Sequence, residues 1–179
     1  NTQLDEQQVE DFIENDSVNL ATGSEVNGAD ILTENSGLDW ANLGGTIPND
    51  SKTGAAFNRE GTQVVLDSST SALCKGFMLG MYGKTNSATV KGGLLECTWL
   101  DVGRCDQNGG NGTLTISGGE IKIANYLNIP TQFATQVDPS KIGYGRVDLL
   151  NGILSATTLH IGNGETGFRY ANFLSNACL

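Results

Sequence analysis

A repeated segment that ends in glycine constrains this chain of 179 residues more than any other feature. The letters VKGG at residues 90–93 recur as ISGG at 116–119 and, more loosely, as LLNG at 149–152. A fixed-period repeat is typical of a stack of coils in which each coil contacts its neighbours. The sequence therefore predicts an all-β stack in which equivalent side chains form rows.

Each of these segments precedes a strand in which apolar and polar residues alternate. Residues 94–103 align with residues 153–162 without a gap, and residues 120–130 align with one inserted residue, which we place before Tyr126. Successive side chains of a strand point to opposite faces. The alternation predicts four inward-facing side chains in the first of these strands, namely Leu95, Cys97, Leu100 and Val102.

The order of short motifs along residues 38–165 resembles the glycine-rich β-solenoid repeats of secreted bacterial surface proteins. These include autotransporter-type passenger repeats and repeats attached to polysaccharide-degrading enzymes. The motifs are Asp39-Trp40, Pro48, Leu79-Gly80, Gly92-Gly93, Val102-Gly103, Gly118-Gly119 and Ile161-Gly162. The resemblance implies a parallel β-helix, usually right-handed, in an extracellular setting. It identifies no activity, because such repeats serve as spacers, adhesins and carbohydrate-binding modules alike.

The chain is expected to contain one main domain and an N-terminal appendage. Residues 1–17 are predicted to form a capping segment with a short helix, because apolar residues recur there at helical spacing. A helix that binds a partner is the alternative. Residues 18–179 are predicted to form the β-solenoid domain, with an inserted loop at 131–142 that projects from the stack.

The charge is unevenly distributed along the chain, whose net charge is −10. Residues 1–67 contain 13 acidic residues against Lys52 and Arg59, whereas residues 68–179 are nearly neutral. The chain lacks the basic stripe that nucleic-acid binding requires, so we expect no nucleic-acid partner. An anionic polysaccharide stays open as a partner, because the repeat half holds eight basic residues.

The sequence also bears on the cellular location and on the oligomeric state of the protein. No apolar run approaches the 18 or more residues of a membrane-spanning helix, so we expect no membrane insertion. The chain opens at Asn1 without a hydrophobic leader, and we interpret it as a mature or excised piece of a secreted protein. The sequence leaves a homo-oligomer open, since a short stack exposes two ends and flat faces.

The four cysteines suggest disulfides rather than zinc, because none forms a CxxC pair and His160 is the sole histidine. Aligning the repeats places Cys74 beside Cys97 in adjacent coils. A bridge between them is one interpretation, and two buried free thiols are the other. Cys105 and Cys178 would form the remaining pair, although four cysteines allow three pairings.

The sequence contains no complete motif for catalysis or for cofactor binding. The GNGETG segment at 162–167 matches a dinucleotide-binding pattern, but the residues after it are too few for the required βαβ unit. Asp106 opens a segment that resembles a calcium loop without its later ligands, which leaves a structural Ca²⁺ as an open alternative. We predict that the protein is not an enzyme. A polysaccharide lyase fragment is a lesser alternative, with Lys122 or Arg146 as its base.

The outward-facing rows point to a function. Trp99 is expected beside Tyr126, next to a row of three outward polar side chains, Asp101, Asn128 and His160. Sugar rings pack on aromatic groups, and their hydroxyls need polar partners. The sequence therefore predicts a non-catalytic carbohydrate-binding module. The predicted ligand-binding residues are Trp99, Asp101, Lys122, Tyr126, Asn128, Tyr144, Arg146 and His160. Two alternatives are a structural or adhesin segment, and aromatic rings that only pack under the insert, the front segment or a neighbouring subunit.

Overall fold

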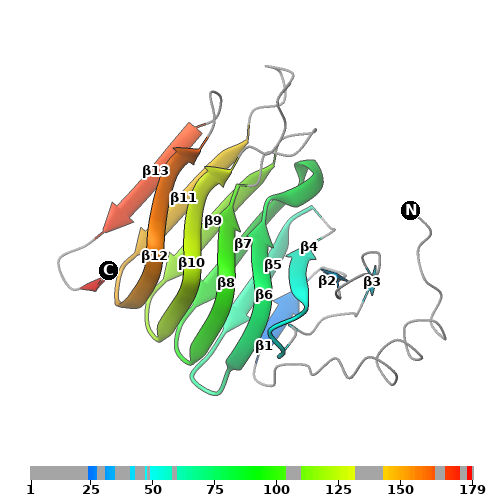
Figure 1. The fold of residues 1–179 in the computed structure, drawn as a ribbon, viewed down its shortest axis with the longest axis vertical. Coiled ribbons are helices and arrows are strands. Elements are labelled where there is room, and N and C mark those ends of the chain that lie inside the picture. The colour runs from blue at the N-terminus through cyan, green and yellow to red at the C-terminus, as the bar shows by residue number, and fades with distance from the viewer. Residues whose placement is uncertain are drawn as a thin grey trace.

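The chain forms two β-sheets, and strands far apart in the sequence lie side by side in each of them (Figure 1). The computed structural model describes residues 24–27, 31–34, 41–42, 47, 49–57, 60–103, 110–131, 143–163, 168–173 and 177–178. The strands are β1 (Ser24–Asn27), β2 (Ile31–Glu34), β3 (Ala41–Asn42), β4 (Gly54–Phe57), β5 (Thr62–Leu66), β6 (Ser71–Leu79), β7 (Thr85–Val90), β8 (Leu94–Val102), β9 (Asn111–Ile116), β10 (Glu120–Thr131), β11 (Tyr144–Leu149), β12 (Gly152–Asn163), β13 (Phe168–Phe173) and β14 (Ala177–Cys178).

From β5 onward, successive strands alternate between the two sheets. The six-stranded sheet has the order β1-β5-β7-β9-β11-β13, and the eight-stranded sheet has the order β14-β12-β10-β8-β6-β4-β2-β3. The strands from β4 to β14 pair in parallel, whereas β1, β2 and β3 pair antiparallel with their neighbours. We call one strand of the six-stranded sheet and the strand that follows it a coil, for example β9 with β10.

These sheets confirm that the fold is all-β and mostly parallel, which is compatible with the predicted β-solenoid. The predicted helix at the N-terminus lies outside the described residues, and so does almost all of the predicted insert at 131–142. The inserted residue of the middle repeat is confirmed, because the pairing of β10 shifts register between Ile123 and Tyr126. The aligned repeats are therefore neighbouring coils in space.

The core lies between the two sheets and consists of their inward-facing side chains. All four residues of β8 that were predicted to face inward are buried, namely Leu95, Cys97, Leu100 and Val102. The six-stranded sheet supplies pairs such as Leu114 with Ile116 to the same core. Burial of a Leu or Ile side chain stabilises a fold by roughly 1.5–3 kcal/mol, so each coil is held mainly by this shared core.

The repeated glycines lie where the turn of one coil rests directly on the turn of the next. Gly93 and Gly119 both have φ of +75°, in the left-handed region that favours glycine. The amide of Glu120 donates to the carbonyl of Gly93 at 2.9 Å, and that of Ile153 donates to the carbonyl of Gly119 at 3.0 Å. A Cβ added to Gly119 would lie 2.6 Å from the carbonyl carbon of Gly92, so the turns leave no room for a side chain.

We predict that Gly119→Ala destabilises the protein much more than Gly61→Ala. Gly61 also has a positive φ, but a Cβ there would meet nothing within 4 Å, so it costs only the roughly 1–2 kcal/mol of the backbone conformation. At Gly119 the turns must also move apart, which adds about 1–3 kcal/mol. Urea unfolding followed by circular dichroism measures both losses. Equal losses would show that the turn contact contributes nothing to stability.

Candidate functional site

Three aromatic side chains form a row across the outer face of the eight-stranded sheet. Trp99 and Tyr126 are register partners on β8 and β10, as predicted. Their ring centroids are 6.4 Å apart with an interplanar angle of 21°, and Tyr126 stacks in turn on His160 of β12 at 6.2 Å and 28°. We call Trp99, Tyr126 and His160 the aromatic row. All three side chains are half-buried.

Two residues of β6 that the sequence analysis missed hold Trp99 in this position. Gly76 is the register partner of Trp99, and a Cβ on Gly76 would lie 2.4 Å from two indole atoms, so the ring occupies the space above the glycine. The ammonium group of Lys75 lies 5.7 Å from the ring centroid, within the range of a cation–π interaction. The glycine beside Trp99 in the aligned repeats was the available signal for this contact.

The predicted polar row exists, but two of its three members are buried. Asp101 and Asn128 are 0% and 1% exposed, so the prediction that they face solvent was wrong, and neither side chain is open to the solvent from which a ligand would approach. Asn128 Nδ2 donates to Asp101 Oδ1 at 2.7 Å, and Asn128 Oδ1 lies 2.8 Å from His160 Nδ1. Buried polar groups must be hydrogen-bonded to offset their lost hydration, and this ladder across three strands meets that need.

The ladder also indicates the tautomer of His160. Asn128 donates through its amide nitrogen to Asp101, so its amide oxygen, which can only accept, faces His160. His160 Nδ1 therefore carries a proton and donates it to Asn128. In the neutral imidazole the other nitrogen, Nε2, is then an acceptor. His160 thus joins a buried ladder to the half-buried aromatic row.

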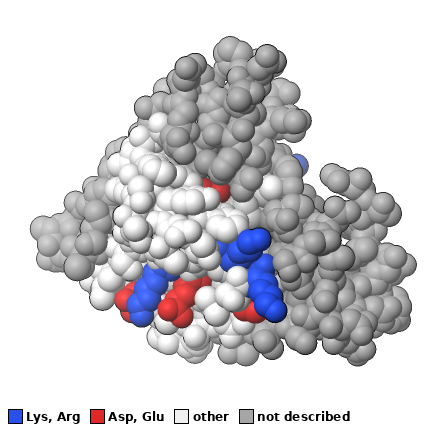
Figure 2. All heavy atoms as spheres, in the orientation of Figure 1, with Lys and Arg blue, Asp and Glu red and all other residues white. Residues whose placement is uncertain are grey.

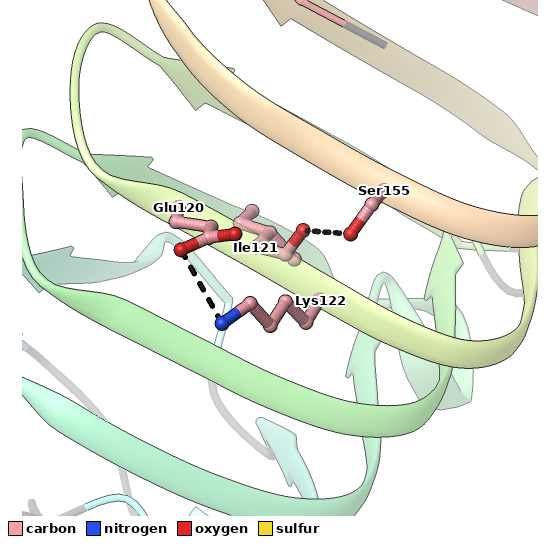
Figure 3. Close-up of polar contacts among 4 residues, drawn as sticks. All are labelled: Glu120, Ile121, Lys122 and Ser155. Carbon is pink, nitrogen blue, oxygen red and sulfur yellow. Dashed lines mark hydrogen bonds and ion pairs between the residues drawn. The ribbon is translucent and has the colours of Figure 1, made fainter.

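A groove of about 420 Å³ lies on the same outer face and crosses four strands. Its lining residues are Ser51, Leu73, Cys74, Glu96, Cys97, Thr98, Lys122, Ile123, Ala124 and Ser155. Lys122 Nζ forms an ion pair with Glu120 at 3.4 Å, and Ser155 donates to the carbonyl of Ile121 at 3.3 Å (Figure 3). The structure therefore places the predicted residue Lys122 in this groove, and the sequence analysis did not foresee the groove itself.

The last two predicted ligand-binding residues lie on the other sheet. Tyr144 and Arg146 are on β11 of the six-stranded sheet, where Phe168 and Tyr170 of β13 are their register partners. Arg146 Nε donates to Asp148 Oδ2 at 2.7 Å. The structure thus divides the predicted set between two sheets, with Trp99, Tyr126, His160 and Lys122 together on one of them.

Cys74 and Cys97 are register partners on β6 and β8, as the aligned repeats predicted. Both are buried free thiols in the structure, which agrees with the second of the two interpretations given above. Cys105 and the side chain of Cys178 lie outside the described residues. Hydrogen bonding with Cys74, and then burial, raise the pKa of the Cys97 thiol well above its ordinary range.

Comparisons with protein-family models, curated proteins and solved structures found no match to this chain. Among the described residues, no three His, Cys, Asp or Glu side chains gather as a metal site. No helix in that part of the chain has the length and apolar character needed to cross a membrane. The function must therefore be argued from the site itself.

We predict that Gly76→Ala displaces the Trp99 indole, because the new methyl group would overlap the ring. The measurement is acrylamide quenching of tryptophan fluorescence in a Trp40→Phe background, where Trp99 is the remaining tryptophan. Quenching should increase in Gly76→Ala and stay unchanged in Gly61→Ala. Unchanged quenching in both variants would contradict the close contact.

We also predict that Cys74 and Cys97 resist alkylation in the folded protein, since the thiolate is the reactive form and both thiols are buried. The measurement is mass spectrometry after iodoacetamide treatment at about pH 8, in a Cys105→Ser, Cys178→Ser background. Both thiols should react fully once urea unfolds the protein. Failure to react in urea until a reductant is added would show that the two cysteines are bridged.

Proposed function

We propose that this protein is a non-catalytic carbohydrate-binding module that recognises an extracellular polysaccharide. One observation carries the proposal: a half-buried aromatic row lies on the same sheet face as a groove that polar and apolar residues line together. Sugar rings present apolar C–H faces to aromatic groups and hydroxyls to polar ones. The outer face of the eight-stranded sheet offers both kinds of partner.

Each residue has a distinct role in this proposal. Trp99 and Tyr126 supply the apolar contact. Because the stacked rings cover part of one another, the ligand meets the outer margin of the row rather than one whole ring face. His160 offers Nε2 as an acceptor for a sugar hydroxyl, with its orientation held by Asn128. Glu96 and Lys122, register partners on β8 and β10, supply charged hydrogen-bonding groups in the groove.

The wider setting is part of the same proposal. The parallel coils are taken to close into a right-handed parallel β-helix of a secreted protein, with residues 1–17 as a cap. The support is the parallel pairing of aligned repeats and the resemblance to bacterial surface repeats. The groove and the aromatic row then lie on the outside of the β-helix, where a polymer too large to enter a closed pocket can reach them.

A structural or adhesin segment is the second candidate, and it is favoured by the side-chain ladders that connect adjacent strands. The ring stack and the Asp101–Asn128–His160 hydrogen bonds both hold coils together, whatever the face binds. In this candidate the aromatic row packs against another copy of the chain. Light scattering that shows a stable oligomer in which Trp99 is shielded from quenchers would favour it.

We predict that polysaccharide in a native gel retards the protein, and that Trp99→Ala or Tyr126→Ala weakens retardation about tenfold, a loss of roughly 1.4 kcal/mol. Affinity gel electrophoresis against a panel of polysaccharides is the measurement. Thr89→Ala, on the six-stranded sheet, is the control and should bind normally. No retardation by any polymer, or equal retardation of all variants, would refute the proposal, provided that circular dichroism shows each variant folded.

A further inference from the structure

The groove on the eight-stranded sheet is longer across the strands than along them. Apart from Ser51, its lining residues come from β6, β8, β10 and β12, which span three strand spacings of about 4.8 Å, or about 14 Å in all. Along any one strand the lining covers at most three consecutive residues, such as 96–98 on β8, or about 7 Å. The groove therefore suits an extended ligand that lies across the strands.

The aromatic row runs in the same direction as the groove. Gly76, Trp99 and Tyr126 are register partners on β6, β8 and β10, and Trp99 directly follows the groove residue Thr98. A chain that lies in the groove would thus have the ring margins along one edge over successive coils. Repeated contacts along one direction suit a polymer of similar units better than they suit a single small molecule.

Lys122 in the groove and Lys75 beside the aromatic row already have partners within the chain. Lys122 pairs with Glu120 at 3.4 Å, and Lys75 lies over the Trp99 ring. Glu96 adds another carboxylate to the groove wall. On the other sheet, Arg146 pairs with Asp148 at 2.7 Å. Figure 2 shows acidic side chains beside basic ones on the face in view.

We infer that the groove binds an uncharged, linear polysaccharide that lies across the strands. This inference rests on the proposed function and narrows it to one class of ligand. A polyanion would compete with Glu120 for Lys122 and would approach the carboxylate of Glu96. An uncharged chain leaves that pair intact and needs only hydrogen bonds and ring contacts.

The test compares neutral polymers with their charged derivatives in affinity gels. The probes are a β-glucan, a xylan and a mannan, each beside its carboxymethylated form. At least one neutral polymer should retard the protein, its carboxymethylated form should retard it less, and about 0.5 M NaCl, where the Debye length is roughly 4 Å, should change nothing. Retardation by charged forms alone, abolished by salt, would overturn this inference and leave the proposed function standing. Retardation by no polymer would refute the proposed function as well.

Oligosaccharides of the retained polymer test the length and direction of the site. A six-unit oligomer should compete about tenfold better than a two-unit oligomer, since only the longer one fills the groove. Equal competition by both lengths would overturn the inference of an extended site.

Two groove-filling variants connect the effect to the structure. Ala124→Trp and Ser155→Trp place an indole at exposed positions that line the groove, and Gln63→Trp, at an exposed position of the six-stranded sheet, is the matched control. Retardation should be lost in the first two variants and kept in the control. Because both positions are exposed, at least one variant should keep the parent circular dichroism spectrum. Retardation kept by folded groove variants would overturn the placement of the ligand.

Discussion

The contact of one glycine turn with the next sets the geometry on which the rest of this structure depends. Each turn donates a backbone hydrogen bond to the turn before it, as Glu120 does to Gly93, and the glycines let the two backbones approach closely. A turn in fixed contact also fixes where the following strand begins. A register slip of one residue would turn every core side chain outward, so the turn and the apolar core enforce the same pairing.

Fixed register converts the sequence repeat into rows of side chains with different properties. One inward row holds Cys74, Cys97 and Ile123, and one outward row holds Trp99 and Tyr126. The extra residue of β10 does not disturb these rows, because the register shift between Ile123 and Tyr126 absorbs it. The irregularity is therefore confined to the segment between Ile123 and Tyr126, and the parts of β10 on both sides of it stay paired with the neighbouring strands.

Much of the fold was predictable because it follows from local patterns. Alternation identified the buried residues of β8, and alignment of the repeats placed Trp99 beside Tyr126 and Cys74 beside Cys97. Burial of the outward face was not predictable in this way. Asp101 occupies an outward position in the alternation, yet it is fully buried, because exposure depends on what packs over a position as well as on which way it points.

The site shows the same division between what register implies and what packing decides. The aligned repeats place Gly76 beside Trp99, but only the orientation of the indole shows that the ring occupies the space above the glycine. The groove combines residues from four strands and Ser51, so no single motif marks it. Tyr144 and Arg146 have side chains suited to sugar binding. They lie on β11 of the six-stranded sheet, however, and the chain enters the eight-stranded sheet only with β12, so they are not on the sheet that holds the aromatic row.

Cohesion of the stack and the proposed recognition of a ligand involve the same side chains, so the two functional candidates are physically linked. His160 is hydrogen-bonded to the buried ladder through Nδ1, and its ring stacks on Tyr126. Those contacts hold three strands together, and they also remove the rotamer freedom that a flexible side chain would lose on binding. Fixed side chains bind at a lower entropic cost. The contacts that join the coils therefore also hold the aromatic row rigid, and specificity then depends on which side chains border that row.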